Sequence, residues 1–393
     1  MAGARITVGG SAKVLVPADG PDVIARPRLE ERLGDVERRR LTLVTAAPGL
    51  GKTTLLAPWA RQSGAAWYTV TAEDRDPTVL ARGLLEAARL RAPALDPAAV
   101  APSPAAEAWV IPAEGQGALA ADQVVGMLTE RLESDLVLVI DDVQELAGAE
   151  SSWRFLADLV REGPAGLHLV LSSRLDPPFA VARLRAQGLA ADLPGSALRF
   201  TEAETAGLLG AVLGPDGPSV AGAVHQATAG WPAAVRLVAQ WLRACPVDDW
   251  PALVAAVGET SNPVEAFLVE DVLAAMPAGV VDMLPGLVSL DRFTPALAGE
   301  VAGAGAGEVV GLLARDGLWV VPDGARDGWF AVPPLLRRFV RSRLAVRPDD
   351  TAAVLRRAEA WMEGRGEKGP ALAGLLAGTG GEADPCVEAG GRV

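Results

Sequence analysis

The stretch TAAPGLGKTTLL at 45–56 has the residue types of a phosphate-binding loop. Such a loop works because successive backbone N–H groups and a helix N-terminus converge on the anion, while a lysine reaches the terminal phosphates and a hydroxyl meets Mg²⁺. A lysine at a helix start is disfavoured by the helix dipole unless an anion offsets it. The pattern therefore favours a nucleotide site over an ordinary strand-to-helix turn. The candidate nucleotide-binding residues of the loop are Pro48, Gly49, Gly51, Lys52, Thr53 and Thr54.

The loop departs from the usual G-x-x-x-x-G-K-[ST] pattern at its first position, which is Ala46 in this chain. Ala46 lies at the exit of the expected strand. The chain need not adopt a positive φ there if Pro48 and Gly49 shape the turn. We therefore expect the loop to hold a nucleotide in spite of Ala46.

A second acidic motif, LVLVIDDVQEL at 136–146, has the form of a Walker B element. That element needs a hydrophobic strand ending in an acid, because the carboxylate must emerge at the carboxyl edge of the sheet beside the metal. We predict that Asp141 lies on the metal side and that Asp142, the candidate catalytic residue, polarises a water. Glu145 is the alternative acid for either role. The other interpretation is that two aspartates merely begin a loop.

A third apolar run, LHLVLSSRLDPP at 167–178, ends near Arg174. Strand ends line the ligand crevice of an open parallel sheet, so Arg174 could reach a γ-phosphate. A surface arginine at a loop is the alternative. His168 and His225 have no acidic or cysteine partner nearby in the sequence, and we expect structural or exposed roles for both.

These motifs lie on alternating strand and helix patterns. Short apolar runs at 41–46, 65–72, 136–142 and 167–174 are typical of buried parallel strands, and helical patterns separate them. This alternation predicts an α/β P-loop NTPase domain with a parallel sheet, followed by a helical domain and a winged-helix domain. Ahead of the sheet, RPRLEERLGDVERRR predicts one amphipathic helix over 26–40.

The helical domain is indicated by the capping signal Thr201-x-x-Glu204. The winged helix is indicated by two short strands followed by a helix, in LWVVPDGARDGWFAV and PPLLRRFVRSRLAV. The expected segments are a flexible N-terminal arm (1–22), a P-loop nucleotide-binding domain (23–200) with a disordered Ala/Pro-rich insertion (92–123), a helical domain (201–263), a winged-helix domain (264–347), and the truncated start of a helical-repeat region with a disordered tail (348–393).

Composition limits the partners. Half of the 393 residues are hydrophobic and 22% are charged, which is typical of a globular chain. The net charge of −13 makes the chain poorly suited to non-specific nucleic-acid binding. One basic cluster stands out, and we expect it to be a solvated helix face and not a DNA site. Its residues are Arg337, Arg338, Arg341 and Arg343.

Two cysteines, Cys245 and Cys386, are far apart and indicate neither a disulfide framework nor a zinc site. The N-terminus lacks a sustained apolar segment, and no stretch offers the roughly 18 apolar residues that a membrane span requires. We expect a soluble cytoplasmic protein with no membrane contact.

Several motifs in order resemble the nucleotide-binding portion of the large MalT-like, LuxR-type bacterial regulators, a branch of the STAND class of signalling ATPases. The resemblance covers roughly 23–362. Members of that family use ATP/ADP exchange as a conformational switch. The motifs are VIARPRL, AAPGLGKTTLLAPWA, AAWYTVTAEDRDP, LVLVIDDVQEL, VLSSRLDPP, LRAQGLAADL with LRFTEAETAGLL, and TAGWPAAVRLVAQWL.

The resemblance implies roles for single residues. Arg26 matches the arm that closes over the nucleotide, and Arg174 matches the sensor on the neighbouring strand. Lys52 and Thr53 would hold phosphates and Mg²⁺, beside the Walker B pair Asp141 and Asp142. Pro232, in the turn Gly230-Trp231-Pro232, would pack on adenine, although on sequence alone it is equally a proline in the first turn of a helix.

Two features depart from that family. The family usually carries a histidine in a Phe-His-Pro-Leu stretch that is thought to sense the ADP phosphate, where this chain has Val332-Pro333-Pro334-Leu335. The resemblance also implies a C-terminal inducer domain and helix-turn-helix, and no DNA-binding domain is evident in these 393 residues.

Three functions remain open. The first is an ATP/ADP-binding switch with Mg²⁺ and slow ATP hydrolysis, which signals through self-association or to a partner regulator. The second is a truncated, non-signalling remnant or decoy that binds partner regulators. The third, an efficient P-loop kinase or motor, would need an acceptor site or a fast hydrolytic apparatus, and the sequence offers neither.

Overall fold

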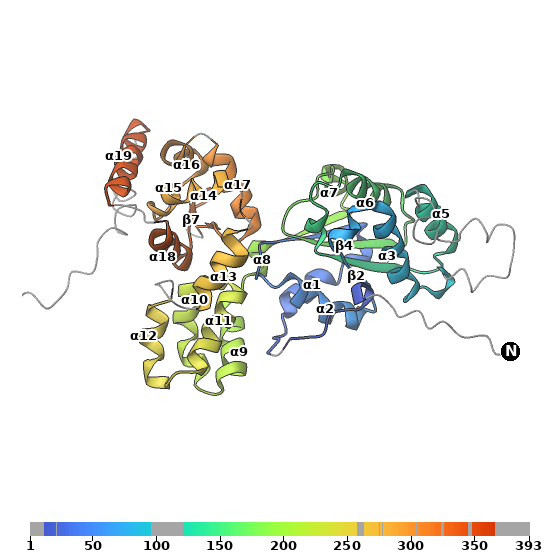
Figure 1. Cartoon of the computed structure of the whole chain (residues 1–393), viewed down its shortest axis with the longest axis horizontal. Helices are drawn as coiled ribbons and strands as arrows, with labels where there is room; N and C mark the ends of the chain where they lie inside the picture. The colour runs from blue at the N-terminus through green and yellow to red at the C-terminus, as the bar shows by residue number, and fades with distance from the viewer. Residues whose placement is uncertain are drawn as a thin grey trace, which may run out of the picture. The chain divides into compact units, whose positions relative to one another are not determined.

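A computed structural model of the chain describes residues 12–20, 22–95, 121–257, 263–274, 276, 278–303, 305–323, 326–344 and 348–365. The chain divides into two compact units, Met1–Leu198 and Arg199–Val393 (Figure 1).

The first unit is built on a five-stranded parallel sheet with the strand order β2-β3-β4-β1-β5. Its strands are β1 (Leu41–Thr45), β2 (Ala66–Thr69), β3 (Leu136–Asp141), β4 (Leu167–Ser173) and β5 (Ala190–Pro194). Its α-helices are α1 (Pro27–Leu33), α2 (Lys52–Ser63), α3 (Pro77–Arg89), α5 (Ala121–Arg131), α6 (Glu150–Glu162), α7 (Ala182–Ala186) and α8 (Gly195–Leu198). Its 3-10 turns are η1 (Ala12–Val14), η2 (Val36–Arg38), η3 (Ala72–Arg75), η4 (Pro93–Leu95) and η6 (Val143–Leu146).

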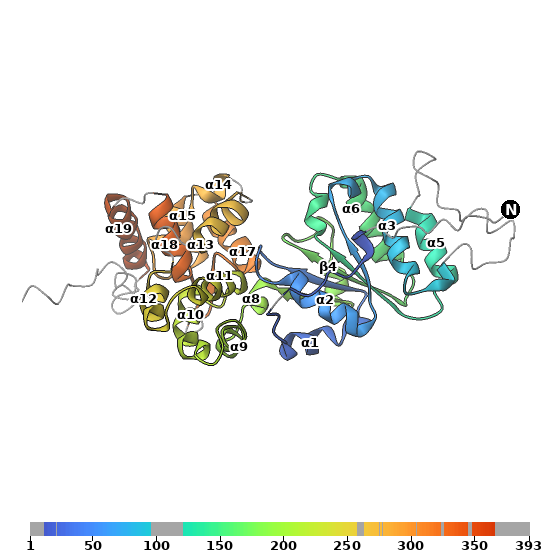
Figure 2. The same cartoon turned by 60° about the horizontal axis from the view of Figure 1, so that its bottom comes forward.

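Both faces of the sheet are covered. Helices α3, α5 and α6 pack on one face, where Leu43, Leu138 and Leu169 contribute to a continuous apolar core, and α1 and α2 lie on the other face (Figure 2). All residues of β3 and β4 are buried, as expected when a parallel sheet has helices on both sides. The predicted α/β P-loop fold is therefore confirmed.

The strand order brings the sequence motifs to one edge. Strand β4 lies between β1 and β3, with Thr45 paired to Ser173 and Ile140 to Leu171. Because the three strands are parallel, their carboxyl ends lie at the same edge of the sheet. The loop after β1, the acids that end β3 and Arg174 after β4 are therefore neighbours.

The second unit is mainly helical. Its first part holds α9 (Glu202–Leu213), η7 (Gly217–Val220), α10 (Ala221–Thr228), α11 (Pro232–Arg243), η8 (Val247–Asp249) and α12 (Trp250–Ala255). Its second part holds α13 (Pro263–Phe267), the π-helix η9 (Leu268–Leu273), α14 (Ala278–Val281), α15 (Leu284–Val288), α16 (Pro295–Ala302), α17 (Ala306–Asp316), the strands β6 (Val321–Pro322) and β7 (Phe330–Ala331), α18 (Pro334–Arg343) and α19 (Pro348–Gly364).

The predicted features of this unit are present. Thr201 and Glu204 form the reciprocal capping box at the start of α9. Strands β6 and β7 pair antiparallel and are followed directly by α18, as expected for a winged helix. The expected order of α/β, helical and winged-helix parts is confirmed.

The single helix expected over 26–40 is wrong. Helix α1 ends at Leu33, and the chain continues through Gly34 and Asp35 into the short turn η2. Glycine and aspartate are poor helix residues, and both stand between the two buried positions Leu33 and Val36. A break at Gly34 lets η2 turn onto the sheet instead of continuing the helix axis.

The N-terminal arm expected to be flexible is docked from Ala12. Val14 is buried in the core of the first unit. Lys13 Nζ lies 3.1 Å from Asp74 Oδ2, and Asp74 is fully buried. The expected disorder of 1–11, of 96–120 within the insertion, and of the tail from 366 lies outside the described residues.

The basic cluster on α18 is only partly a solvated face: Arg338 and Arg343 are exposed, but three of its four arginines hold hydrogen bonds to other elements. Arg337 Nη2 donates to the carbonyl oxygens of Leu290 and Asp291, and its Nη1 pairs with the Asp291 carboxylate. Arg338 donates to the carbonyls of Ala255, at the end of α12, and Val257 just after it, and Arg341 donates to the carbonyl of Val288 at the end of α15. Arginines satisfy the unpaired carbonyls of helix C-termini well, so these three side chains hold helices together.

Candidate nucleotide-binding site

The loop between β1 and α2 has the backbone expected of an anion-binding turn. Gly49 and Gly51 have φ angles of 72° and 83°, in the left-handed region that favours glycine. Ala46 is not among the described residues with positive φ, which confirms that an alanine is sterically acceptable there. A Cβ added at Gly51 would have no atom within 4 Å, so the loop has open space beside its backbone.

Lys52, the first residue of α2, is buried beneath this loop. Its Nζ donates to the carbonyl oxygens of Ala46 at 2.7 Å and Ala47 at 3.3 Å, and the residue is 7% exposed. An ammonium group at the N-terminus of a helix is opposed by the helix dipole, and an anion in the loop would offset that repulsion.

Thr53 and Asp141 are joined directly. The hydroxyl of Thr53 donates to Asp141 Oδ2 at 2.7 Å, which links the start of α2 to the end of β3. The residues are 88 positions apart in the chain, so the sheet topology alone brings them together. The other oxygen, Asp141 Oδ1, is buried and has no hydrogen-bond partner.

Burial raises the pKa of Asp141 above its ordinary value, and the neighbouring carboxylate of Asp142 raises it further. The hydroxyl of Thr53, which donates to Asp141, opposes this rise in pKa by favouring the charged form, as does the nearby hydroxyl of Ser172, which lies outside hydrogen-bond geometry with Asp141. Burial of an ionised carboxylate with one oxygen unbonded is energetically unfavourable unless a cation lies nearby.

The donor set fits Mg²⁺. Thr53 Oγ1 and Asp141 Oδ1 are hard oxygen atoms, and Mg²⁺ is usually bound by one or two such protein groups together with waters and substrate phosphates. Within the described residues no group of three or more histidine, cysteine, aspartate or glutamate side chains could hold a metal by itself. These two oxygens suit a cation that is shared with phosphate.

Asp142 has the strained backbone often found at functional sites. Its φ is 59°, an uncommon value for a residue with a side chain. Gln144 Nε2 donates to Asp142 Oδ1 at 2.8 Å, and Gln144 Oε1 accepts a bond from the backbone N–H of Arg174 at 3.1 Å. Gln144 therefore ties the second Walker B acid to the end of β4.

Gln144 was not predicted from the sequence. Its position in DDVQEL identifies it only as a polar residue after the acids, and the contact with Arg174 spans 30 positions. The alternative acid, Glu145, lies in the same 3-10 turn, where its backbone carbonyl accepts a bond from Arg75.

The remaining predicted residues are placed as follows. Arg26 is 5% exposed, and its Nη2 donates to the carbonyl of Leu198 at 2.7 Å. Pro48 lies in the turn of the loop, and Thr54 is exposed on the first turn of α2. Pro232 lies in the second unit as the first residue of α11. Its role at a nucleotide stays a prediction, as do the roles of the other site residues.

The turn before Pro232 depends on its glycine. Gly230 has a φ of 70°, and a Cβ there would come within 2.2 Å of the Phe200 carbonyl oxygen. The side chain of Trp231 is buried and packs against Phe267 with ring centroids 5.6 Å apart. Of the described histidines, His168 is buried with Nδ1 2.6 Å from the Arg39 carbonyl, and His225 Nδ1 lies 3.2 Å from the Thr205 hydroxyl.

The parallel sheet and this loop define a P-loop nucleotide-binding fold. Residues 26–172 match the AAA ATPase domain family, and residues 269–352 match the MalT winged helix domain family. The chain thus carries an ATPase domain followed by a MalT-type winged helix, which confirms the resemblance to the MalT-like STAND ATPases.

Individual proteins agree with these matches. The chain is 29% identical over 355 residues to the serine/threonine-protein kinase PknK of Mycobacterium tuberculosis, covering 88% of this chain and 31% of the kinase. It is 26% identical over 339 residues to the HTH-type transcriptional regulator MalT of Yersinia enterocolitica, covering 84% of this chain and 36% of the regulator. The chain therefore spans about a third of the length of these relatives.

Among solved structures, the Walker-type ATPase paby2304 of Pyrococcus abyssi has a similar fold. The TM-score is 0.51 at 13% identity, and the match covers 83% of this chain and 100% of the other. Among the residues that the structure describes, no helix is long and apolar enough to cross a membrane.

Proposed function

We propose that this chain is the nucleotide-dependent switch of a MalT-like regulator: it binds ATP or ADP with Mg²⁺, hydrolyses ATP slowly, and changes conformation with the nucleotide. The observation that carries the proposal is the 2.7 Å bond from Thr53 to Asp141, with the second oxygen of Asp141 buried and unpartnered. A cation and a phosphate in the loop would satisfy both residues at once.

Each residue has a role that its position supports. Gly49 and Gly51 give the loop its left-handed turns, and the open space beside Gly51 leaves room for phosphate oxygens near the N–H groups of the loop. Lys52 would exchange its carbonyl partners for the terminal phosphates. Thr53 and Asp141 would hold Mg²⁺, whose chemistry is to neutralise charge on the phosphates.

Asp142 would orient the attacking water, because its carboxylate is fixed by Gln144 and is not needed by Thr53. Arg174 follows β4 at the same edge of the sheet and would approach the γ-phosphate. One carboxylate and one arginine are few parts for fast hydrolysis, which favours a switch over a kinase or a motor. A slow cycle is what a regulator needs, since each state must last long enough to be read.

The relatives support the regulatory part of this proposal. One is named a transcriptional regulator and another a protein kinase, and both match this chain over its ATPase and winged-helix parts. A shared nucleotide-binding module would serve to control different outputs. We infer that the receiver of the signal is a second copy of this chain or a partner regulator.

Lys52→Ala tests the nucleotide site. Binding of a fluorescent ADP analogue should be lost, while the melting temperature and circular dichroism stay close to those of the unchanged chain, because the Lys52 ammonium bonds the loop carbonyls of Ala46 and Ala47 and the strands do not depend on it. Ser63→Ala, an exposed change at the other end of α2, is the matched control and should bind normally. Retained affinity in Lys52→Ala would show that the loop does not hold the phosphates.

Turnover separates the switch from the other candidates. Multiple-turnover phosphate release at saturating Mg-ATP should lie well below the ~10 s⁻¹ of a typical enzyme. Turnover near that value would favour an efficient enzyme. A protein that carries no nucleotide after purification, and takes none up on soaking, would favour the remnant that binds partners without switching.

A further inference from the structure

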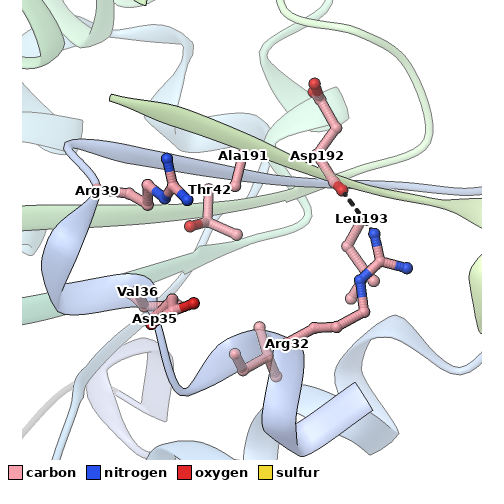
Figure 3. Close-up of a pocket in the computed structure, with 9 residues that line it drawn as sticks. Arg32, Asp35, Val36, Arg39, Thr42, Ala191, Asp192 and Leu193 are labelled. Atoms are coloured by element: carbon pink, nitrogen blue, oxygen red, sulfur yellow. Dashed lines mark hydrogen bonds between the residues drawn. The ribbon is translucent and has the colours of Figure 1, made fainter. Parts of the chain in front are cut away.

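A cavity with charged and polar side chains in its lining lies in the first unit, away from the phosphate-binding loop. It has a volume of about 210 Å³ and lies between α1 and η2 on one side and β1 and β5 on the other, partly open to solvent (Figure 3). Thr42, in its lining, is the second residue of β1 and pairs with Ala191 of β5. The phosphate-binding loop begins at Ala46, about 13 Å further along the strand direction at 3.3 Å per residue. The cavity is therefore separate from the nucleotide site.

Two arginines line this cavity without carboxylate partners. Arg32 Nη2 reaches only the backbone carbonyl of Asp192, at 3.4 Å, and Arg39 Nη1 donates to the backbone carbonyl of Gly188. Neither arginine forms an ion pair with any residue in the described part of the chain. Figure 3 shows the two side chains entering from opposite sides, Arg32 from α1 and Arg39 from the residue directly after η2.

The two acids of the lining are already paired with other arginines. Asp192 accepts bonds from Arg185 Nε at 2.8 Å and Nη2 at 2.7 Å. Asp35 lies 3.2 Å from Arg38 Nη1. Counted together with Arg185 and Arg38, the lining has four arginines against two aspartates, so positive charge exceeds negative charge around the cavity by two.

Two buried polar atoms of the lining also lack partners. Arg39 Nε and Thr42 Oγ1 are buried without any hydrogen bond, and Thr42 as a whole is 4% exposed. Burying such groups without a partner is unfavourable. Since Nη1 of Arg39 is used by Gly188, the edge formed by Nε and Nη2 remains, and this edge can bind two oxygens of one anion in parallel.

We propose that this cavity binds a small oxyanion, either a phosphate group or a carboxylate. The Arg39 edge would donate to two oxygens, the Thr42 hydroxyl would donate to one of them, and Arg32 would close the site from α1. A phosphate or a short carboxylic acid suits the volume, which is several times the roughly 30 Å³ of a water.

The test is calorimetric titration of inorganic phosphate, and separately of acetate, into the chain carrying Lys52→Ala, so that the nucleotide loop does not contribute. We expect saturable binding of at least one of the two anions, and the tighter of them identifies the natural source of the oxyanion. Adding Arg39→Met should weaken that binding by about tenfold or more, because the charged edge is lost. Adding Arg161→Met, an exposed arginine on α6 outside the cavity, is the matched control and should leave it unchanged.

Thr42→Val keeps the proposal testable if Arg39→Met does not fold. Valine has the same shape, so the variant should fold, and anion affinity should fall about threefold to tenfold with the loss of one hydrogen bond. Its melting temperature without anion should not fall, since an unpartnered buried hydroxyl has been removed. Absence of binding for both anions would overturn the proposal, as would equal affinity in the Thr42→Val, Arg39→Met and parent chains, which would mean an adventitious ion only.

Discussion

At the scale of single residues, the proposed catalytic acid depends on a neighbour that contacts no phosphate. Asp142 has a left-handed backbone and one carboxylate oxygen bonded to Gln144, whose other amide atom accepts the Arg174 N–H. A single amide side chain therefore sets the orientation of Asp142 and the position of the end of β4. We infer that Gln144 positions the parts that act on the γ-phosphate.

Gln144→Met should separate binding from hydrolysis. Methionine preserves length but offers neither polar atom, so single-turnover hydrolysis should fall roughly 10-fold to 100-fold, somewhat less than the loss of a positioned base itself. The dissociation constant for ATP should change less than about twofold, because the loop and Lys52 are untouched. Gln187→Met, on an exposed residue of the same unit, is the matched control. An equal loss of binding and hydrolysis would indicate a merely structural role.

We expect ionised Asp141 to lower the stability of the nucleotide-free fold, although the same carboxylate would bind the metal. Burial raises its pKa, so the folded state holds the proton more tightly than the unfolded state, and this group's contribution to stability is lost as pH rises through that pKa. At neutral pH the ionised form therefore destabilises the nucleotide-free fold. The same carboxylate is the residue that we assign to the cation.

Asp141→Asn should consequently raise the melting temperature of the nucleotide-free chain. The free energy of unfolding should rise by about 1 kcal/mol, because a group that lowers the stability of the fold is replaced. An amide oxygen can still accept the Thr53 bond, so packing is preserved. The extra stabilisation by Mg-ADP over ADP alone should disappear. Asp158→Asn, in a surface ion pair with Arg161, should change neither quantity much. A lower melting temperature without nucleotide would contradict this account.

At the scale of elements, the sequence predicted a strand or helix correctly wherever the residues of that segment alone determine its secondary structure. The runs LTLVT and LVLVID are apolar throughout and form buried strands. Strand β5 was missed, because AADLP has one large apolar residue, Leu193, and ends in proline. Such a strand is stable at the edge of a sheet, where it needs only β1 as a neighbour.

The residues of the candidate site likewise fall into those that the sequence alone could place and those whose position depends on strand order. Lys52 and Thr53 follow the loop after β1 and Asp141 ends β3, so the sequence alone could place them at one edge of a parallel sheet. Gln144 could not be assigned, since its partner on β4 depends on strand order. The hydrogen bonds of Arg338 and Arg341 on α18 could not be predicted for the same reason, because the helix C-termini that these side chains contact lie far away in the sequence.

Arg337→Met should therefore destabilise the winged helix. Burial lowers the pKa of Arg337 while Asp291 opposes that shift, so the guanidinium is held in a partly buried ion pair. Its loss leaves Asp291 and two carbonyls without their donor, and the unfolding free energy should fall by roughly 3 kcal/mol. Arg343→Met, on an exposed arginine of the same helix, is the matched control for denaturant unfolding. Equal unfolding free energies of the two variants would show that Arg337 contributes no more to stability than an exposed arginine does.

At the scale of the whole molecule, the two units meet in the chain between Leu198 and Arg199. On one side of this junction, Arg26 and Arg28 donate to the carbonyls of Leu198 and Ala197, both at 2.7 Å. On the other side, Arg199 donates to the carbonyls of Gly317, Ala229 and Leu318. Ala229 directly precedes the Gly230-Trp231-Pro232 turn, so the junction is tied to the predicted nucleotide contacts of each unit.

The rate of amide hydrogen exchange across 195–201 should therefore change when a nucleotide binds. If the nucleotide draws the Arg26 guanidinium away from Leu198, exchange there should rise roughly fivefold, the change expected when a bond worth about 1 kcal/mol is lost. Arg26→Met should raise this exchange without nucleotide and make it insensitive to nucleotide. Arg28→Met should retain the response, because Arg28 bonds Ala197 and has no predicted nucleotide contact. Exchange that stays the same while the unchanged chain demonstrably binds ADP would separate binding from any signal at the junction, and would refute the switch while leaving the nucleotide site intact.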